Sequence, residues 1–204
     1  MLACVKLDAK KRKIVILGDG ACGKTSLLKV FTQGYFPQVY EPTVFKNYTQ
    51  AIEVRGTTVE LSLWDTAGQE EFDRLRSLAY ADSHVAMLCF AVDNRNSLEN
   101  IEGKWLSEIQ VYCPGVILVL VALKCDLRHD PIVKDRLARF GTSPVTYEEG
   151  LELAKQLRAA RYLECSAKFN RGVQECFQQV AQVALNAKLI RSHENIGSGL
   201  CSLL

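Results

Sequence analysis

Long apolar runs and a dominant charge are both missing from this sequence of 204 residues. No apolar run approaches the length of about 20 residues that a membrane-spanning helix needs. The net charge is only +2, which gives no argument for nucleic acid as a partner, and we expect none. Residues 1–13 are rich in lysine but contain no apolar core of a secretory signal. Hydrophobic residues make up 48% of the chain, which is ordinary for a globular domain.

Closely spaced cysteines are also missing, although the chain has eight cysteines. No two of them form a C-x-x-C pair, so a zinc site is not expected. Several lie within apolar strand-like runs, where a cysteine serves as a small core residue. We therefore expect a reducing, intracellular setting in which disulfides do not form.

A glycine-rich motif, GDGACGKT at residues 18–25, fits the pattern G-x-x-x-x-G-K-S/T. The apolar run 13–17 predicts a buried strand before it, and helical spacing of apolar residues predicts a helix after it, to about residue 33. In such a phosphate cradle, backbone N–H groups and the helix N-terminus face the anion. Lys24 would reach the β- and γ-phosphates and the Thr25 hydroxyl would bind Mg²⁺. The motif therefore predicts a nucleoside triphosphate site.

The rest of the chain alternates apolar strand-like runs with helical patterns. Continuous apolar strands between helices predict an α/β domain with a mainly parallel sheet covered by helices on both faces. The expected elements are an antiparallel hairpin of 44–54 and 57–64, strands at 85–92, 116–122 and 161–165, a helix capped by Ser97 and running to Tyr112, and helices at 147–160 and 172–189.

The same patterns divide the chain into three segments. Residues 1–12 are expected to form a basic arm, and 13–188 a single nucleotide-binding domain. Within the domain, the polar insert at about 128–146 predicts an exposed short helix. The stretch 189–204 loses periodicity and is expected to be a flexible tail.

Asp65 stands where a second contact to Mg²⁺ is needed, at the end of an apolar strand. A carboxylate there can hold the ion, often through water, because Mg²⁺ keeps part of its hydration shell. The residues that follow are Thr-Ala-Gly-Gln-Glu, which is more specific than an isolated strand-end aspartate. We therefore expect Asp65 to share the metal with Thr25.

The run DTAGQE at 65–70 resembles the switch II motif of the Ras superfamily of small GTPases, and the loop around Thr43 resembles switch I. The segment 36–45, the phosphate motif 18–25 and the insert are most similar to the Rho family. The resemblance covers residues 13–188, and several motifs in the right order make it specific. It implies an α/β domain of the P-loop NTPase type, with a six-stranded, mostly parallel sheet and helices on both faces. It also implies a guanine nucleotide switch that hydrolyses GTP to GDP and phosphate.

The resemblance also implies roles for individual residues. Gln69 would orient the attacking water, and the Gly68 N–H would meet the γ-phosphate. Thr43 would hold both Mg²⁺ and the γ-phosphate, so that both switch loops relax when this phosphate leaves. A side chain at Gly20 would crowd the γ-phosphate and block a partner's arginine finger. The expected catalytic residues are Gln69, Lys24 and Thr43, and the expected metal ligands are Thr25, Thr43 and Asp65.

Base recognition is expected at the other end of the site. Asp126 can accept hydrogen bonds from N1 and the exocyclic amine of guanine, two donors that adenine lacks. By resemblance, the Ala167 N–H would bind guanine O6, the Lys124 stem would lie along the base, and Phe36 would pack against its edge. The residues expected to bind the nucleotide are Gly18, Asp19, Gly20, Ala21, Cys22, Gly23, Lys24, Thr25, Ser26, Phe36, Tyr40, Thr43, Asp65, Gly68, Lys124, Asp126, Leu127, Ser166, Ala167 and Lys168.

Leu123 departs from the family's base motif, which begins with Asn or, in some Rho relatives, Thr. Leucine can neither bond the base nor tie its loop to the phosphate cradle. A neutral hydrogen bond contributes about 0.5–1.5 kcal/mol, so losing one or two would weaken nucleotide binding roughly 10- to 100-fold if nothing compensates. We therefore predict faster GDP release than in Asn-bearing relatives. The alternative is that Leu123 only continues the apolar strand and other contacts compensate.

The last four residues, Cys201-Ser-Leu-Leu, fit the prenylation pattern C-a-a-X, and a final Leu favours a geranylgeranyl group. Stable anchoring usually needs a second signal. The basic cluster 10–13 or S-acylation of Cys4 could provide it. We expect a lipid-anchored protein at the cytoplasmic face of the plasma membrane or of vesicles, with a cytosolic pool.

The resemblance implies several classes of partner. Effectors would bind switch I, at about residues 40–48, and switch II. GTPase-activating proteins, exchange factors and a Rho-type dissociation inhibitor would regulate the protein, which would signal to actin organisation, polarity or vesicle traffic. Two alternatives remain open. One is a fast-exchanging, mostly GTP-loaded scaffold, and the other is an ATP-using P-loop kinase, against which Asp126 and residues 166–168 argue.

Overall fold

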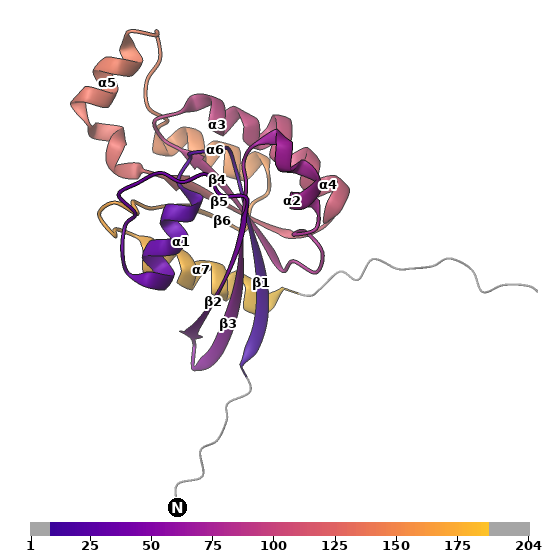
Figure 1. The fold of residues 1–204 in the computed structure, drawn as a ribbon. Coiled ribbons are helices and arrows are strands. Elements are labelled where there is room, and N and C mark those ends of the chain that lie inside the picture. Colours follow the sequence, from indigo (N-terminus) through magenta and orange to yellow (C-terminus); the bar gives the residue numbers. More distant parts are fainter. Residues whose placement is uncertain (1–8, 188–204) are drawn as a thin grey trace, which may run out of the picture.

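Six strands form one sheet, in the order β2-β3-β1-β4-β5-β6, in a computed structural model that describes residues 9–187 (Figure 1). Strands β2 and β3 are antiparallel, and the other neighbouring pairs are parallel. This confirms the predicted α/β fold. The strands are β1 (Lys10–Leu17), β2 (Phe45–Val54), β3 (Thr57–Thr66), β4 (Val85–Ala91), β5 (Ile117–Leu123) and β6 (Arg161–Glu164).

Helices cover both faces of the sheet (Figure 1). Alternate residues of β1 enter two separate cores, Ile14 and Ile16 on one face and Val15 and Leu17 on the other, as the two-residue period of a strand requires. The first face is covered by α1 (Lys24–Gln33) and α7 (Val173–Asn186). The second face is covered by α3 (Arg95–Asn100), the π-helical turn η2 (Ile101–Leu106), α4 (Ser107–Tyr112) and α6 (Tyr147–Gln156).

The site residues follow the carboxyl ends of the strands. The phosphate motif follows β1, the switch II motif begins within β3, and the two base-recognition segments follow β5 and β6. Ligands of open α/β sheets bind at this edge, where neighbouring connections leave in opposite directions. After β3 the chain forms a 3-10 turn, η1 (Glu70–Phe72), and a short helix, α2 (Asp73–Ser77).

Several predicted boundaries are wrong at the ends of elements, two of them at the starts of β1 and α3. Strand β1 begins at Lys10, inside the expected arm 1–12, because Lys10, Lys11 and Arg12 pair with β3. The helix expected to be capped by Ser97 begins at Arg95, with Asn94 at the cap position. Ser97 is fully buried, and its Oγ accepts a hydrogen bond from the Ala91 N–H at 3.0 Å. It therefore pairs with the backbone at the end of β4 and does not cap the helix.

The insert forms the expected exposed helix, α5 (Pro131–Ala138), which projects from the body of the domain (Figure 1). It follows a 3-10 turn, η3 (Cys125–His129). Helices α6 and α7 both end several residues before their predicted ends. Within the described residues no helix is long and apolar enough to cross a membrane. The predicted lipid sites, Cys4 and Cys201, lie outside the described residues.

Candidate nucleotide site

The phosphate motif forms a tight loop between β1 and α1. Gly18 has φ +138°, and a Cβ there would lie 2.1 Å from the carbonyl oxygen of Cys89, so only glycine fits this turn. The Lys24 side chain is buried and its Nζ donates to the carbonyls of Gly18 at 2.6 Å and Asp19 at 2.8 Å. The loop therefore holds its own lysine over its centre, in the position expected of a phosphate ligand.

Three oxygen-bearing side chains meet beside this loop. Thr25 Oγ1 donates to Asp65 Oδ2 at 2.7 Å and lies 2.7 Å from Thr43 Oγ1. These residues come from α1, β3 and the loop before β2, and they are the three predicted metal ligands. Burial raises the pKa of Asp65, and the hydrogen bond from Thr25 opposes that rise. The cluster joins the phosphate loop to both switch segments.

The other oxygen of the Asp65 carboxylate, Oδ1, has no partner in this cluster. Asp65 Oδ1 is buried and has no hydrogen-bond partner among the described residues. A buried carboxylate oxygen without a partner is strongly disfavoured unless a cation or a water completes it. Oxygen-only donors of this type suit Mg²⁺. The residues present therefore fit a magnesium ion.

A second unpaired carboxylate oxygen marks the base end. Asp126 Oδ1 is also buried without a partner among the described residues. Lys124, two residues earlier in the chain, has a left-handed backbone conformation, φ +57°, and lines the cavity of this site. Ala167 and Lys168 line the same cavity, whereas Ser166 is fully buried and supports the loop by accepting from the Phe169 N–H at 3.3 Å. Recognition of guanine requires an acceptor for its N1–H and its exocyclic amine, and the unpaired Asp126 oxygen is such an acceptor.

Leu123 lies between the base segment and the phosphate loop. It is the last residue of β5 and is 3% exposed. A Cβ built on Gly23 would lie 3.7 Å from Leu123 Cδ1, in ordinary van der Waals contact. Leu123 thus places an apolar side chain near the phosphate loop, where the family's Asn would tie the loops by hydrogen bonds. It continues the apolar strand, as one of the two alternatives expected, and its effect on GDP release stays a prediction.

An ion pair missed in the sequence ties the two base segments together. Arg128 donates to both oxygens of Glu164, at 2.7 and 2.6 Å, and to the carbonyl of Val145 at 2.8 Å. Tyr162 adds a donor to the same carboxylate. Arg128 follows the Asp126 segment and Glu164 precedes the Ala167 segment, so this bidentate pair fixes their spacing. In the sequence, the only sign of this ion pair is that an Arg and a Glu stand near the two base-recognition motifs.

Switch II lies directly against the phosphate loop. A Cβ on Gly68 would lie 2.2 Å from the Gly20 nitrogen and 2.3 Å from the Asp19 carbonyl carbon. A Cβ on Gly20 would meet only Gln69 Cγ, at 3.7 Å, so the protein alone leaves room there. The predicted clash of a side chain at position 20 would therefore be with the γ-phosphate and with a partner's arginine, not with the protein itself.

These segments enclose one cavity of about 400 Å³. Most predicted site residues line it; Gly18, Asp19, Cys22, Asp65 and Ser166 lie behind its wall. Several other lining residues could not be predicted, because most of them lie in the switch I loop or at strand ends, which carry no periodic signal. They are Lys29, Pro37, Val39, Glu41, Lys46, Thr66 and Ala67.

Comparison with known proteins agrees with this geometry. The sequence model of the Ras family matches residues 13–186. The chain is 64% identical over 177 residues to the GTP-binding protein rho3 of Schizosaccharomyces pombe, covering 87% of this chain and 84% of that protein. It is 68% identical over 167 residues to the GTP-binding protein Rho3 of Schizophyllum commune, covering 82% and 81%. The chain belongs to the Rho family of small GTPases.

The Saccharomyces cerevisiae GTP-binding protein RHO3 is 53% identical over 210 residues, covering 93% of this chain and 91% of that protein. As a Rho-family GTPase, the protein is a GTP-binding switch and a GTP hydrolase that works with regulators and effectors, and it is a membrane-associated signalling protein. This membership decides against the ATP-using kinase.

Proposed function

We propose that this Rho-family GTPase binds GTP with Mg²⁺ held by Thr25, Thr43 and Asp65. The observation that carries the proposal is that Thr25 Oγ1 contacts both Thr43 Oγ1 and Asp65 Oδ2, while the other oxygen of Asp65, Oδ1, is buried without a partner among the described residues. The ion would supply charge neutralisation of the phosphates, and it would bind both switch segments through one centre. Loss of the γ-phosphate would then release Thr43 and Gly68 together.

Three residues would act on the phosphates during hydrolysis. Lys24 holds its ammonium at the loop centre and would stabilise charge on the phosphoryl oxygens. Gln69 lines the cavity beside Gly20 and would orient the attacking water. Thr43 would close switch I over the same phosphate. At the other end, Asp126 would accept from guanine and Ala167 would donate to it.

Removing the Asp65 carboxylate tests the metal proposal. In the wild type, chelating Mg²⁺ should speed GDP release by about tenfold or more, which corresponds to at least 1.4 kcal/mol. In Asp65→Ala, release should already be fast with Mg²⁺ present and should not respond to the chelator. Glu60→Ala is the matched control, because Glu60 lies on the same strand and forms only a half-exposed ion pair with Lys11. A variant that still responds like the wild type would contradict the proposal.

Leu123 supports a second candidate, a fast-exchanging protein that is mostly GTP-loaded. Its side chain can pack against Gly23 but cannot bond the base. The hydrolytic residues Gly20 and Gln69 are present, so GTP loading in this candidate would come from rapid exchange. The rate of GDP release separates the two candidates.

The surface around the site would receive the partners. Large apolar side chains are exposed in both switch regions, and they suit effectors that recognise the GTP-bound form. GTPase-activating proteins, exchange factors and a dissociation inhibitor would act at the same regions. The exposed apolar residues are Tyr40, Val44, Phe45, Leu75 and Leu78.

We also propose a lipid anchor at Cys201 for the membrane association, with Cys4 as a second acylation site. The basic cluster 10–13 is a weaker candidate, because Arg12 Nε donates to the carbonyl of Ala184 at 2.7 Å and Lys13 lies over the Trp64 ring. The protein would sit at the cytoplasmic face of the plasma membrane or of vesicles. In a cell fractionation, Cys201→Ser should move fully to the soluble fraction, and Cys4→Ser partly. Membrane retention of Cys201→Ser would exclude prenylation as the anchor.

A further inference from the structure

The long helix between β4 and β5 changes its winding in the middle. It begins as α-helix at Arg95, becomes a π-helix over Ile101–Leu106 and returns to α-helix at Ser107. π-helical turns are rare and carry wider i→i+5 hydrogen bonding, often at functional sites. Gly103, within this turn, has open space around its missing Cβ, so close packing does not impose the turn there.

The π-helical turn brings two polar side chains to one target. In an α-helix of 3.6 residues per turn, Asn100 and Trp105 would point about 140° apart. In a π-helix, residues five apart lie about one turn apart and can share a face. Asn100 Nδ2 donates to Asp19 Oδ2 at 2.7 Å, and Trp105 Nε1 donates to Asp19 Oδ1 at 2.8 Å. The altered winding therefore builds a two-donor clamp on one carboxylate.

The clamped residue belongs to the phosphate loop. Asp19 lies between Gly18 and Gly20, and its own carbonyl accepts from Lys24 at 2.8 Å. A carboxylate free to turn toward bound phosphates would repel them, since like charges at short range disfavour each other. Each oxygen of Asp19 instead has one donor from the helix. The clamp thus holds this negative charge on the outer side of the loop and fixes the loop backbone.

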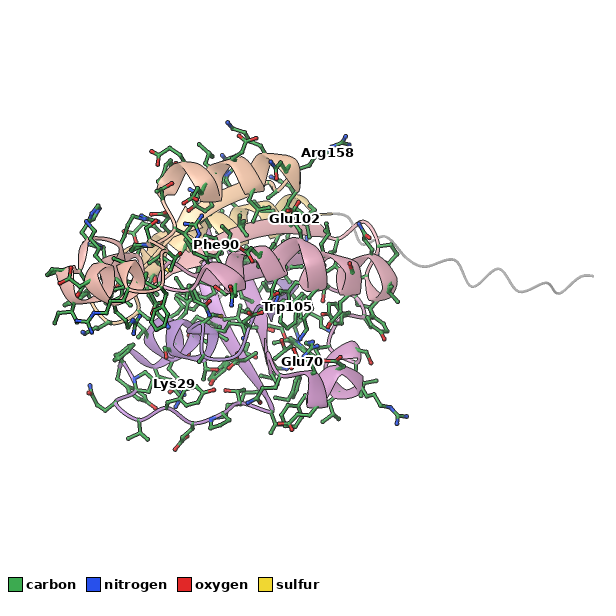
Figure 2. All side chains as sticks on the ribbon, turned by 90° about the horizontal axis from the view of Figure 1, so that it is seen from above. Lys29, Glu70, Phe90, Glu102, Trp105 and Arg158 are labelled. Carbon is green, nitrogen blue, oxygen red and sulfur yellow. The ribbon has the colours of Figure 1, made fainter. Side chains whose placement is uncertain are left out.

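The same tryptophan also touches switch II. Trp105 is fully buried, with the Arg76 guanidinium 4.8 Å and Lys104 Nζ 4.7 Å from its ring centre. Arg76 donates to the carbonyl of Gln69 at 3.2 Å, and Lys104 pairs with Glu70 at 2.5 Å. Figure 2 shows Trp105 on the side of the helix that faces the segment carrying Glu70. One side chain therefore joins the phosphate loop to the catalytic segment.

We propose that Asn100 and Trp105 are positioning residues of the nucleotide site. Through Asp19 they hold the phosphate loop in its binding conformation and thereby set the rate of GDP release. The proposal rests on the proposed function, because it assumes that GDP occupies this cavity. It assigns to the π-helical turn the task of bringing both donors to one carboxylate.

The clamp can be detected without any nucleotide measurement. The chain has two tryptophans, and Trp64 Nε1 donates to Ser62 Oγ at 2.9 Å, away from Asp19. In a ¹H–¹⁵N NMR spectrum the Trp105 indole signal should shift upfield in Asp19→Ala, while the Trp64 signal stays. An unchanged Trp105 signal would overturn the clamp, whether or not the wild type binds GDP.

The kinetic test is a double-mutant cycle on release of fluorescent GDP. Trp105→Phe keeps the ring but removes the donor, and it should speed release about tenfold, as expected for a lost hydrogen bond to a charged group. In the Asp19→Ala background the same change should have no further effect. Equal acceleration with and without Asp19 would show that Trp105 acts by packing alone. Gly103→Ala, in the same turn, is the control and should release GDP at the wild-type rate.

Discussion

Replacing Gly68 with alanine is expected to lower the rate of GTP hydrolysis about 100-fold or more, the range for removal of one transition-state donor. The new Cβ would stand 2.2 Å from the Gly20 nitrogen and 2.6 Å from the Gly18 carbonyl oxygen. Both atoms are backbone, so the switch II segment must move away from the phosphate loop. Its N–H and the Gln69 side chain would then lose their positions over the γ-phosphate.

Single-turnover hydrolysis of preloaded GTP measures this effect. GDP affinity should change little, because the Gly68 N–H is proposed to bind only the γ-phosphate, which GDP lacks. Gly103→Ala again serves as the control, since a Cβ there meets no atom within 4 Å. Hydrolysis within a few-fold of the wild-type rate in Gly68→Ala would mean that switch II does not need this close approach.

Replacing Arg76 with alanine is expected to destabilise the fold by about 3–5 kcal/mol, as for other broken buried ion pairs. The guanidinium is fully buried and donates to Glu108 at 2.9 and 2.6 Å and to the carbonyl of Ala67 at 2.8 Å. Tyr80 donates to the same Glu108 at 2.7 Å. Without Arg76, the partly buried carboxylate of Glu108 keeps only Tyr80 as a donor, and the carbonyls of Ala67 and Gln69 lose the donor that Arg76 provides.

Thermal unfolding in excess GDP should show a fall in Tm of roughly 10 °C or more for a domain of this size. Arg74→Ala is a matched control, because Arg74 is exposed on the same short helix and should change stability by less than about 0.5 kcal/mol. Arg76→Lys should recover only part of the loss, since lysine lacks the planar fork. Equal Tm values for Arg76→Ala and Arg74→Ala would refute the network's role.

Acid should weaken the same network. Burial acts to raise the pKa of Glu108, but the hydrogen bonds from Arg76 and Tyr80 outweigh it and lower the pKa. The stabilisation by an acid with a lowered pKa is present above its unfolded pKa and is lost as the pH falls through the folded pKa. The stability difference between the wild type and Arg76→Ala should therefore shrink below about pH 4.3, the ordinary pKa of glutamate.

The strands and most helices could be predicted because their signals are local. The continuous apolar run of β4 indicates that both of its faces are buried, and the alternation of apolar and polar residues in β2 and β3 indicates one buried face. Element ends were harder to predict. Lys10 and Lys11 are polar, and only pairing with β3 makes them part of a strand. Ser97 resembles a helix cap in sequence but is buried as a partner for the end of β4.

The candidate site could be predicted where chemistry restricts the residue type. Glycine at position 18, a carboxylate at position 65 and a carboxylate at position 126 each stand next to a strand end, and the structure brings their segments to one cavity. Asn100 and Trp105 carried no such signal. A tryptophan within a helical apolar pattern is typical of a core residue, and nothing in the sequence marks the π-helical turn that places Trp105 against Asp19.

The measurement that tests the central claim most directly is the release of fluorescent GDP from the purified protein with Mg²⁺, chased by GTP or by ATP. The account predicts that the chase with excess GTP displaces the bound nucleotide and ATP does not, because the unpaired Asp126 oxygen needs a donor that adenine lacks. In Leu123→Asn the release should be slower. Equal displacement by ATP would contradict a site that recognises guanine. Unchanged release in Leu123→Asn would show that other contacts already compensate for the missing Asn.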